Sequence, residues 1–361
     1  MRWWGRAAAL GALLSAAVVV PPAASGAATS PWLLDASSTG GTTALLTVAM
    51  GQRSNPANTF GEVFALNPSG QLRLVTPTGT ATNGGLVLAV DATGRSAAAT
   101  MPSASLHLTP VAQASPGPGP WKSALLPRAL LGAPGSLSEG PLGLFAVTSD
   151  GQLLGTKTGW SWAPVHLSAA RSVATRCGGT LAAVGQTASR VLVGLSCPRP
   201  GTWPLASPAG PVSVAGGGPT GPARCLRVLG TPSGFVALVA ISGPRPSLVV
   251  LASNDGGNHA TVAPLASLTP GQSLRSTAIS TSGSVAAVVD GVHGPLLFVR
   301  RGGVLTSATL PSGSQVAVFT ASGSIETVAT KAGAVVVSAP SGSRWVVHQR
   351  LSVALPYGSS G

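Results

Sequence analysis

Charged residues are scarce in this sequence. Only 8% of its 361 residues are Asp, Glu, Lys or Arg, whereas 44% are apolar. A disordered chain needs fewer apolar and more charged residues, so this composition excludes disorder and also argues against a helix bundle. No stretch after residue 30 keeps a 3.6-residue hydrophobic period, and we therefore expect negligible helix.

Cysteine is also rare, since Cys177, Cys197 and Cys225 are the three in the chain. At most one disulfide can form within it. The midpoint of Cys177 and Cys197 falls in a predicted turn, Gln186–Ser189, so these two residues should face each other across a hairpin. The alternative is that Cys225 pairs with one of them, which the sequence leaves open. No close Cys pair or His partner has zinc-ligand spacing, and we expect neither metal nor cofactor.

Glycine and proline are abundant, with 48 and 31 copies, and they mark a repeated turn. Each copy is a short polar segment that ends in Gly between apolar runs of strand length, as a tight hairpin requires. A weaker copy, Gln186–Ser189, lacks the Gly. The six full copies are Asn67–Gly70, Asp91–Gly94, Thr148–Gly151, Thr231–Gly234, Ser280–Gly283 and Thr320–Gly323.

Three predicted strands follow each of the last three turns. They cover residues 235–241, 247–253 and 259–265, then 284–289, 295–300 and 303–310, then 324–329, 334–339 and 345–351. With the strand before the turn, each unit has four strands and recurs roughly every forty residues. We therefore predict an all-β fold, a β-propeller of seven four-stranded blades.

Two segments between the predicted third and fourth strands resemble the Asp-box, Ser-x-Asp-x-Gly-x-x-Trp, of sialidase-type (BNR) repeats. One segment contains Ser253, Asp255 and Gly257, and has Ala260 in place of Trp. The other contains Ser338, Gly342 and Trp345, and has Pro340 in place of Asp. The chain thus resembles secreted bacterial propellers with degenerate repeats of this kind. The resemblance implies a structural role for these residues, because in that family the box is a turn away from the catalytic centre.

The tryptophans support the same period. Trp121, Trp162 and Trp203 are spaced 41 and 41 residues apart, and Trp345 follows the position of Ala260 by 85 residues, close to two further periods. The resemblance implies that these side chains pack between strands.

The N-terminus has the pattern of a secretory signal. Arg2 and Arg6 precede an apolar stretch at 7–20 and small residues at 23–27. A retained membrane anchor is less favoured, because the stretch is shorter than the roughly 20 residues that span a bilayer. We expect a signal peptide at 1–27, one propeller domain at 28–355 and a flexible tail at 356–361. Export to an oxidising compartment agrees with a disulfide.

The net charge is +13, or +11 once Arg2 and Arg6 are removed with the signal. The basic residues are scattered along the chain, which suits binding to an exported protein or to an anionic cell-envelope polymer. We expect the protein itself to be extracellular and monomeric. Nucleic acid is disfavoured, because no basic stripe alternates with aromatics.

Acids and tyrosine are too few for the common glycan-hydrolysing sites. A sialidase-like site needs a Tyr nucleophile, and the sole tyrosine, Tyr357, lies near the C-terminus. A glycosidase needs two facing carboxylates. The acids are Asp35, Glu62, Asp91, Glu139, Asp150, Asp255, Asp290 and Glu326. Asp91, Asp150 and Asp255 fall in turns, Glu326 in a strand, and Asp290 in a loop with His293. We predict a secreted, non-catalytic propeller that serves as a binding or scaffold module for a protein or a cell-wall glycan. The alternative is a sialidase-like or other glycan-acting hydrolase.

Overall fold

The protein is almost entirely β. The computed structural model describes residues 32–37, 44–51, 59–67, 69, 71–76, 86–91, 95–100, 109–114, 121–158, 161–208 and 210–352. Residues Thr29–Ala354 form one compact unit. The predicted signal peptide at 1–27 and tail at 356–361 lie outside the described residues, and the limits 28–355 of the domain stay a prediction.

Most of the described strands form five antiparallel sheets, each of four strands in chain order. The first two sheets contain β1 (Trp32–Ser37), β2 (Ala44–Gly51), β3 (Thr59–Leu66) and β4 (Leu72–Leu74), then β5 (Leu86–Val90), β6 (Ser96–Thr100), β7 (Thr109–Ala114) and β8 (Lys122–Leu126). The third contains β9 (Leu137–Gly140), β10 (Gly143–Val147), β11 (Leu153–Thr156) and β12 (Ala163–Pro164). The last two contain β22 (Ser273–Ile279), β23 (Val285–Gly291), β24 (Gly294–Arg301) and β25 (Val304–Thr309), then β26 (Ser314–Phe319), β27 (Ile325–Lys331), β28 (Ala334–Ser341) and β29 (Arg344–Ser352).

A nine-stranded sheet completes the described set. Its strands are β13 (Thr180–Gln186), β14 (Val191–Cys197), β15 (Leu205–Ser207), β16 (Gly210–Pro211), β17 (Ser213–Val214), β18 (Ala223–Thr231), β19 (Gly234–Ile241), β20 (Ser247–Ser253) and β21 (His259–Ser267). Two residue pairs, Ser196 with Arg224 and Cys197 with Ala223, join β14 to β18. The sheet therefore reads as two meanders, β13–β16 and β18–β21, with β17 added in parallel to β21. If this sheet is counted as two blades, the described sheets together agree with the predicted seven blades, a number that stays a prediction.

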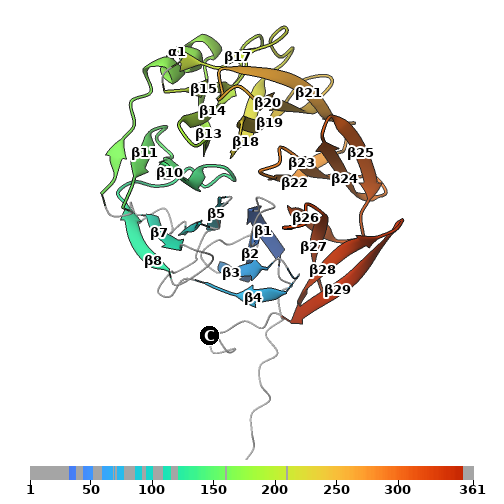
Figure 1. The fold of residues 1–361 in the computed structure, drawn as a ribbon. Helices are drawn as coiled ribbons and strands as arrows, with labels where there is room; N and C mark the ends of the chain where they lie inside the picture. The colour runs from blue at the N-terminus through green and yellow to red at the C-terminus, as the bar shows by residue number, and fades with distance from the viewer. Residues whose placement is uncertain are drawn as a thin grey trace, which may run out of the picture. The chain divides into compact units, whose positions relative to one another are not determined.

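The first strands of the meanders lie innermost in a ring (Figure 1). Each contacts the first strand of the next meander, from β1 through β5, β9, β13, β18, β22 and β26 back to β1. The approach of β13 to β18 requires Gly185, because a Cβ there would lie 2.4 Å from the carbonyl oxygen of Val228. This arrangement is a β-propeller, which confirms the predicted fold class.

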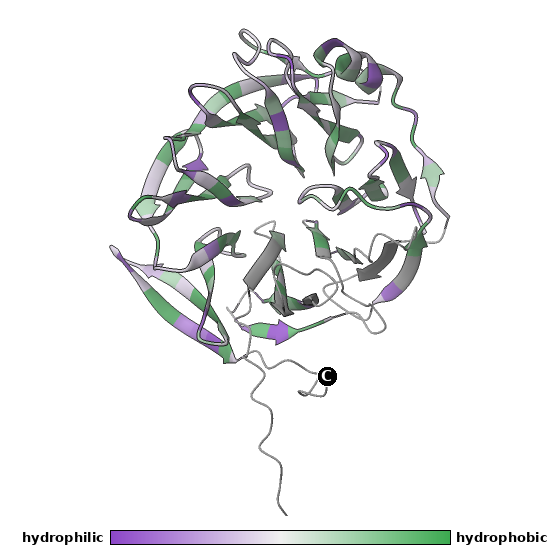
Figure 2. Cartoon of the chain, turned by 180° about the vertical axis from the view of Figure 1, so that it is seen from behind, coloured by the Kyte–Doolittle hydropathy of each residue, from purple (hydrophilic) through white to green (hydrophobic). Residues whose placement is uncertain are grey.

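Side-chain packing closes the ring between the first and last sheets. One core cluster contains Leu46 and Phe64 of the first sheet together with Val318 and Val335 of the last. The backbone N–H of Leu72 also donates to Oε1 of Gln349, at 2.7 Å. Every strand of these two sheets pairs within its own sheet, so among the described residues the closure depends on packing rather than on a shared sheet. Figure 2 shows hydrophilic segments on the outer strands of the last sheet, where the strands face solvent.

The strands predicted in the last three units agree with the structure. Residues 247–253, for example, form β20 without change, and 259–265 fall within β21. The runs are readable because the second strand of a blade is buried on both faces, as in β19 and β23, so its residues are almost continuously apolar.

The predicted turns do not all occupy the same place in a blade. Thr231–Gly234, Ser280–Gly283 and Thr320–Gly323 connect first to second strands. The turn at Asn67, however, connects the third strand β3 to β4, and Thr148–Gly151 connects the second strand β10 to β11. The common phase assumed for the repeat was therefore wrong at these two turns, whereas Asp91–Gly94 and Gln186–Ser189 also connect first to second strands, β5 to β6 and β13 to β14. Any tight hairpin favours the same polar residues and Gly, so the turn sequence shows where a hairpin lies but not which two strands of the blade it connects.

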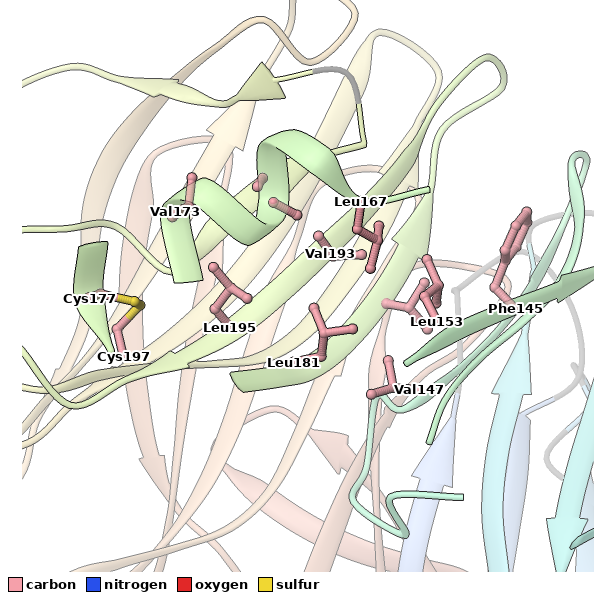
Figure 3. Close-up of a cluster of buried hydrophobic side chains, with 13 residues drawn as sticks. Phe145, Val147, Leu153, Leu167, Val173, Cys177, Leu181, Val193, Leu195 and Cys197 are labelled. Atoms are coloured by element: carbon pink, nitrogen blue, oxygen red, sulfur yellow. A yellow bond between two sulfur atoms is a disulfide. The ribbon is translucent and has the colours of Figure 1, made fainter. Parts of the chain in front are cut away.

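One helix was missed by the sequence analysis. Helix α1 (Ser168–Cys177) buries Ala170, Val173 and Cys177, a helical spacing that is too short to stand out over ten residues. It ends at Gly178, whose φ of 65° gives the left-handed cap that glycine favours. Figure 3 shows α1 beside β14 of the nine-stranded sheet, with Val173 close to Leu195.

Candidate functional site

The centre of the ring is lined by the innermost strands and is largely filled. The cavity there measures about 50 Å³. Small-molecule sites are usually roughly 300–1,000 Å³. Its polar lining includes Ser138 and Glu139 of β9, Arg227 of β18 and Thr277 of β22. Glu139 is the one carboxylate among the described residues that line the cavity, and it is 8% exposed.

Arg227 connects three sheets across this centre. Its Nε donates to Oγ1 of Thr277 at 2.9 Å, and its Nη2 donates to the carbonyl oxygen of Ala36 at 2.9 Å. A β-bulge between Cys225 and Arg227 precedes it, and bulges occur between first and second strands of four other blades. A bulge redirects a side chain, which suits a residue that must point across the ring. No sequence motif marked Arg227, because its partners are 50 and 191 residues away.

The other described carboxylates are distributed around the sheets in local roles. Asp91 accepts from the backbone N–H of Arg95 at 2.9 Å, which is the predicted turn role. Asp290 was predicted in a loop with His293, but it belongs to strand β23 and forms an ion pair with Arg275. The loop of that hairpin is shorter than expected, because Gly291 already pairs with Gly294.

Glu326 lies in strand β27, as predicted, and is almost fully buried. Burial raises the pKa of its carboxyl above the ordinary value, and attraction to His348 partly opposes this shift. Nε2 of His348 is 3.6 Å from Oε1 of Glu326. The second carboxylate oxygen, Oε2, is buried without a hydrogen-bond partner among the described residues.

The segment with Ser253, Asp255 and Gly257 forms a self-bonded turn between β20 and β21. Ser253 Oγ donates to Asp255 Oδ1 at 2.8 Å, and the N–H of Gly257 donates to Ser253 Oγ at 3.1 Å. Asp255 also accepts from the backbone N–H groups of Asn258 and His259. These bonds, those from His259 foremost, hold the pKa of Asp255 well below its ordinary value. All of these hydrogen bonds are local, so the turn is held by its own side chains and backbone.

The segment with Ser338, Gly342 and Trp345 has a different conformation. The ladder of β28 and β29 continues to the pair Ser341 with Arg344, which leaves a two-residue loop. Ser338 lies inside the ladder, opposite Val347. Pro340 replaces the Asp that would hold a wider turn, so the strands extend to a tight hairpin with Gly342 at φ 59°.

Four tryptophans lie at junctions between successive blades. Trp121, Trp162, Trp203 and Trp345 are each partly buried against one of four different core clusters, and each cluster joins two blades. Trp121 donates to the carbonyl oxygen of Val75 at 2.7 Å, and Trp203 to that of Gly217 at 3.1 Å. Ala260 is buried at the position where the repeat lacks Trp.

Two of these tryptophans line grooves much larger than the central cavity. The Trp345 groove, of about 580 Å³, lies between the last two sheets and includes Leu297, Val304, Ile325 and Arg301. Arg301 also lies over the ring of Phe319, 5.8 Å from its centroid. The Trp162 groove, of about 490 Å³, includes Arg128, Asp150 and Gln152. Sequence reasoning could not find either groove, because each combines segments from two blades.

The structure has a disulfide between Cys177 and Cys197, which is the pairing expected from the sequence, with a Cα–Cα distance of 5.1 Å (Figure 3). The sequence suggested that both cysteines lie in the hairpin, but Cys177 is the last residue of α1. The hairpin turn itself is at Thr187–Arg190. Cys225 is free and buried, and burial raises the pKa of its thiol to about 12.

Within the part of the chain that the structure describes, no three His, Cys, Asp or Glu side chains gather as metal ligands. The same residues contain no helix with the length and hydrophobicity to cross a bilayer.

No protein-family model and no curated protein matches the chain. Solved structures do resemble it. A protein from Lactobacillus plantarum superposes with a TM-score of 0.51 at 12% identity, over 88% of this chain and 98% of the other. A candidate 6-phosphogluconolactonase from Bacteroides uniformis gives 0.51 at 12%, over 87% and 97%, and one from Bacteroides fragilis gives 0.50 at 10%, over 87% and 96%. At such identities the likeness shows the fold alone, a β-propeller.

Proposed function

We propose that this chain is an exported, non-catalytic binding propeller, which holds an exported protein or an anionic cell-envelope polymer on its outer grooves. The observation that carries the proposal is the contrast in size between the centre and the blade junctions. The central cavity of about 50 Å³ is crossed by Arg227, whereas the Trp162 and Trp345 grooves measure about 490 and 580 Å³. Of these three spaces, each lined by described residues, the two grooves can hold a ligand of more than a few atoms and the central cavity cannot.

The charge of the chain supports an anionic partner. Two of its acids, Asp150 and Asp290, form ion pairs with Arg128 and Arg275, so their charge is locally compensated. Basic side chains exposed on different sheets, among them Arg73 and Arg350, leave the surface positive. Such a field attracts anionic polymers, and salt weakens the attraction.

The alternative is a sialidase-like or other glycan-acting hydrolase. Its nucleophile would be Tyr357, which lies outside the described residues. A carboxylate pair would have to face one substrate. Glu139 lines the central cavity, whereas Asp290 pairs with Arg275 and Glu326 is buried against His348. These placements favour binding over hydrolysis.

Two measurements test the proposal together. The mature chain should retain a component of a cell-envelope preparation from its own organism, and retention should fall as salt is raised. It should not hydrolyse a fluorogenic sialoside faster than the Asp290→Ala, Glu326→Ala double variant does. Turnover above that control would establish the hydrolase alternative, and an absence of retention at low salt would remove the electrostatic part of the proposal.

A further inference from the structure

The Trp162 groove differs chemically from the Trp345 groove. Arg128 precedes the third sheet, Asp150 and Gln152 belong to the β10–β11 turn, and Trp162 and Pro164 stand at β12. The Trp345 groove has Arg301 as its charged residue and is otherwise mainly apolar. The Trp162 groove instead places a cation, a carboxylate and an amide beside an aromatic ring.

The polar side of the groove is held in place by its own hydrogen bonds. Nη1 of Arg128 donates to Oδ2 of Asp150 at 2.8 Å, and Nε2 of Gln152 donates to the same oxygen at 3.2 Å. Thr148 donates its hydroxyl to Oδ1 of Asp150, and accepts from the backbone N–H of Gln152 at 3.0 Å. Three planar polar groups are therefore positioned before any ligand arrives, which lowers the entropy cost of binding.

These groups remain accessible from solvent. The Arg128 and Asp150 side chains are 51% and 43% exposed. A guanidinium offers five N–H donors, and a carboxylate can accept about four hydrogen bonds, so both can bind each other and a ligand. The hydroxyl of Thr148, and then the charge of Arg128, hold the pKa of Asp150 below its ordinary value, so the carboxylate is ionised near neutral pH.

The remaining lining of the groove is mainly apolar. Trp162 packs partly against a core cluster with Leu154, Leu130 and Leu137, which fixes the ring at the junction of the second and third sheets. Pro164 also lines the groove. An aromatic face with fixed orientation attracts the weakly positive C–H groups of a flat ligand.

We propose that the Trp162 groove is a saccharide subsite, which binds a sugar ring with adjacent hydroxyls against Trp162, Asp150 and Arg128. Sugar hydroxyls both donate and accept hydrogen bonds, and so match a fixed carboxylate beside a guanidinium, while the C–H face of the ring covers the indole. A phosphate group matches Asp150 less well than a hydroxyl does, because an ionised carboxylate accepts hydrogen bonds but donates none. An apolar peptide fits the Trp345 groove better, because that groove offers few polar partners. The proposal rests on the proposed binding function and names the chemistry of one of its ligands.

The test is binding of defined sugars to the full mature chain. The probes are the methyl glycosides of glucose, galactose, mannose and N-acetylglucosamine, followed by saturation-transfer NMR and by tryptophan fluorescence titration. At least one glycoside should bind, and Arg128→Gln and Asp150→Asn should each weaken it about tenfold or more, the loss expected for a hydrogen bond to a charged group. Arg350→Gln is the matched control, since it removes the same charge from an exposed position that does not line the groove, and it should change the affinity by less than about twofold.

Folding of the variants is checked by their melting temperatures, and Arg128→Gln keeps the test decisive if Asp150→Asn disturbs its turn. Absence of saturation transfer from every glycoside at millimolar concentration overturns the saccharide subsite, as does binding that both groove variants leave unchanged. Loss of a retained protein, rather than of a sugar, on Arg128→Gln also overturns it. In each of these cases the unmodified chain could still retain an envelope component. Failure of the saccharide proposal is therefore distinguishable from failure of the proposed binding function.

Discussion

Arg227 should contribute more to stability than any exposed arginine of the propeller. It is the side chain that ties β18 to β1 and β22 through two hydrogen bonds of 2.9 Å each. Replacing it by Met keeps most of the apolar stem but removes both bonds and the positive charge from a cavity that Glu139 also lines. Hydrogen bonds made by a charged group are worth about 1.5–3 kcal/mol each, so Arg227→Met should lower the free energy of unfolding by roughly 3–6 kcal/mol.

Two further variants separate the causes of that loss. Arg227→Lys keeps the charge, but an ammonium cannot reproduce the fork that reaches two strands, so about half the loss should remain. Arg301→Met is the matched control, because Arg301 is exposed and contacts Phe319 through a cation–π interaction worth about 0.5–1 kcal/mol.

The assay is urea unfolding of the mature chain, followed by tryptophan fluorescence, since partly buried tryptophans lie at several blade junctions. The midpoint should fall for Arg227→Met and change little for Arg301→Met. A loss below about 1 kcal/mol for Arg227→Met would refute the view that Arg227 ties the ring, because two charge-assisted bonds must exceed that value. Arg227 would then be available for a ligand.

Three remaining predictions concern buried groups. Because burial raises the pKa of Glu326, the fold favours the protonated acid, and this group's contribution to stability is lost as pH rises above the ordinary range of a Glu. Glu326→Gln should therefore raise the free energy of unfolding by roughly 1–3 kcal/mol at about pH 7 and by little near pH 4. Thermal melting of both proteins at the two pH values measures this difference. An equal gain at both pH values would contradict burial of the ionised carboxyl as the cause. Replacing both Cys177 and Cys197 by Ala opens a loop with a sequence separation of 20 and should cost about 3 kcal/mol in denaturant unfolding. Native protein should leave Cys225 unlabelled by thiol reagents, whereas recovery of Cys225 in a disulfide on non-reducing peptide mapping would reverse this pairing.

Local chemistry determined much of what the sequence could predict. Apolar runs such as 247–253 are strands because both faces of an inner blade position are buried, and a run of that length has few other ways to satisfy its backbone. The Asp255 turn was also readable, because its donors and acceptors lie within six residues of one another. The same holds for the repeat of Trp121, Trp162 and Trp203, whose spacing follows the length of a blade.

Only the tertiary structure decided the features that join distant segments. Arg227 reaches residues 50 and 191 positions away, and Leu72 meets Gln349 only after the ring has closed. The Trp162 groove exists because the chain before the third sheet, a hairpin turn and the strand β12 come together at one junction. Contacts across the ring are set by which surfaces pack together, and packing depends on side-chain shapes that no local sequence pattern records. The sequence by itself therefore determined the strands, the turns and the fold class, while the cavity and the grooves required the assembled propeller.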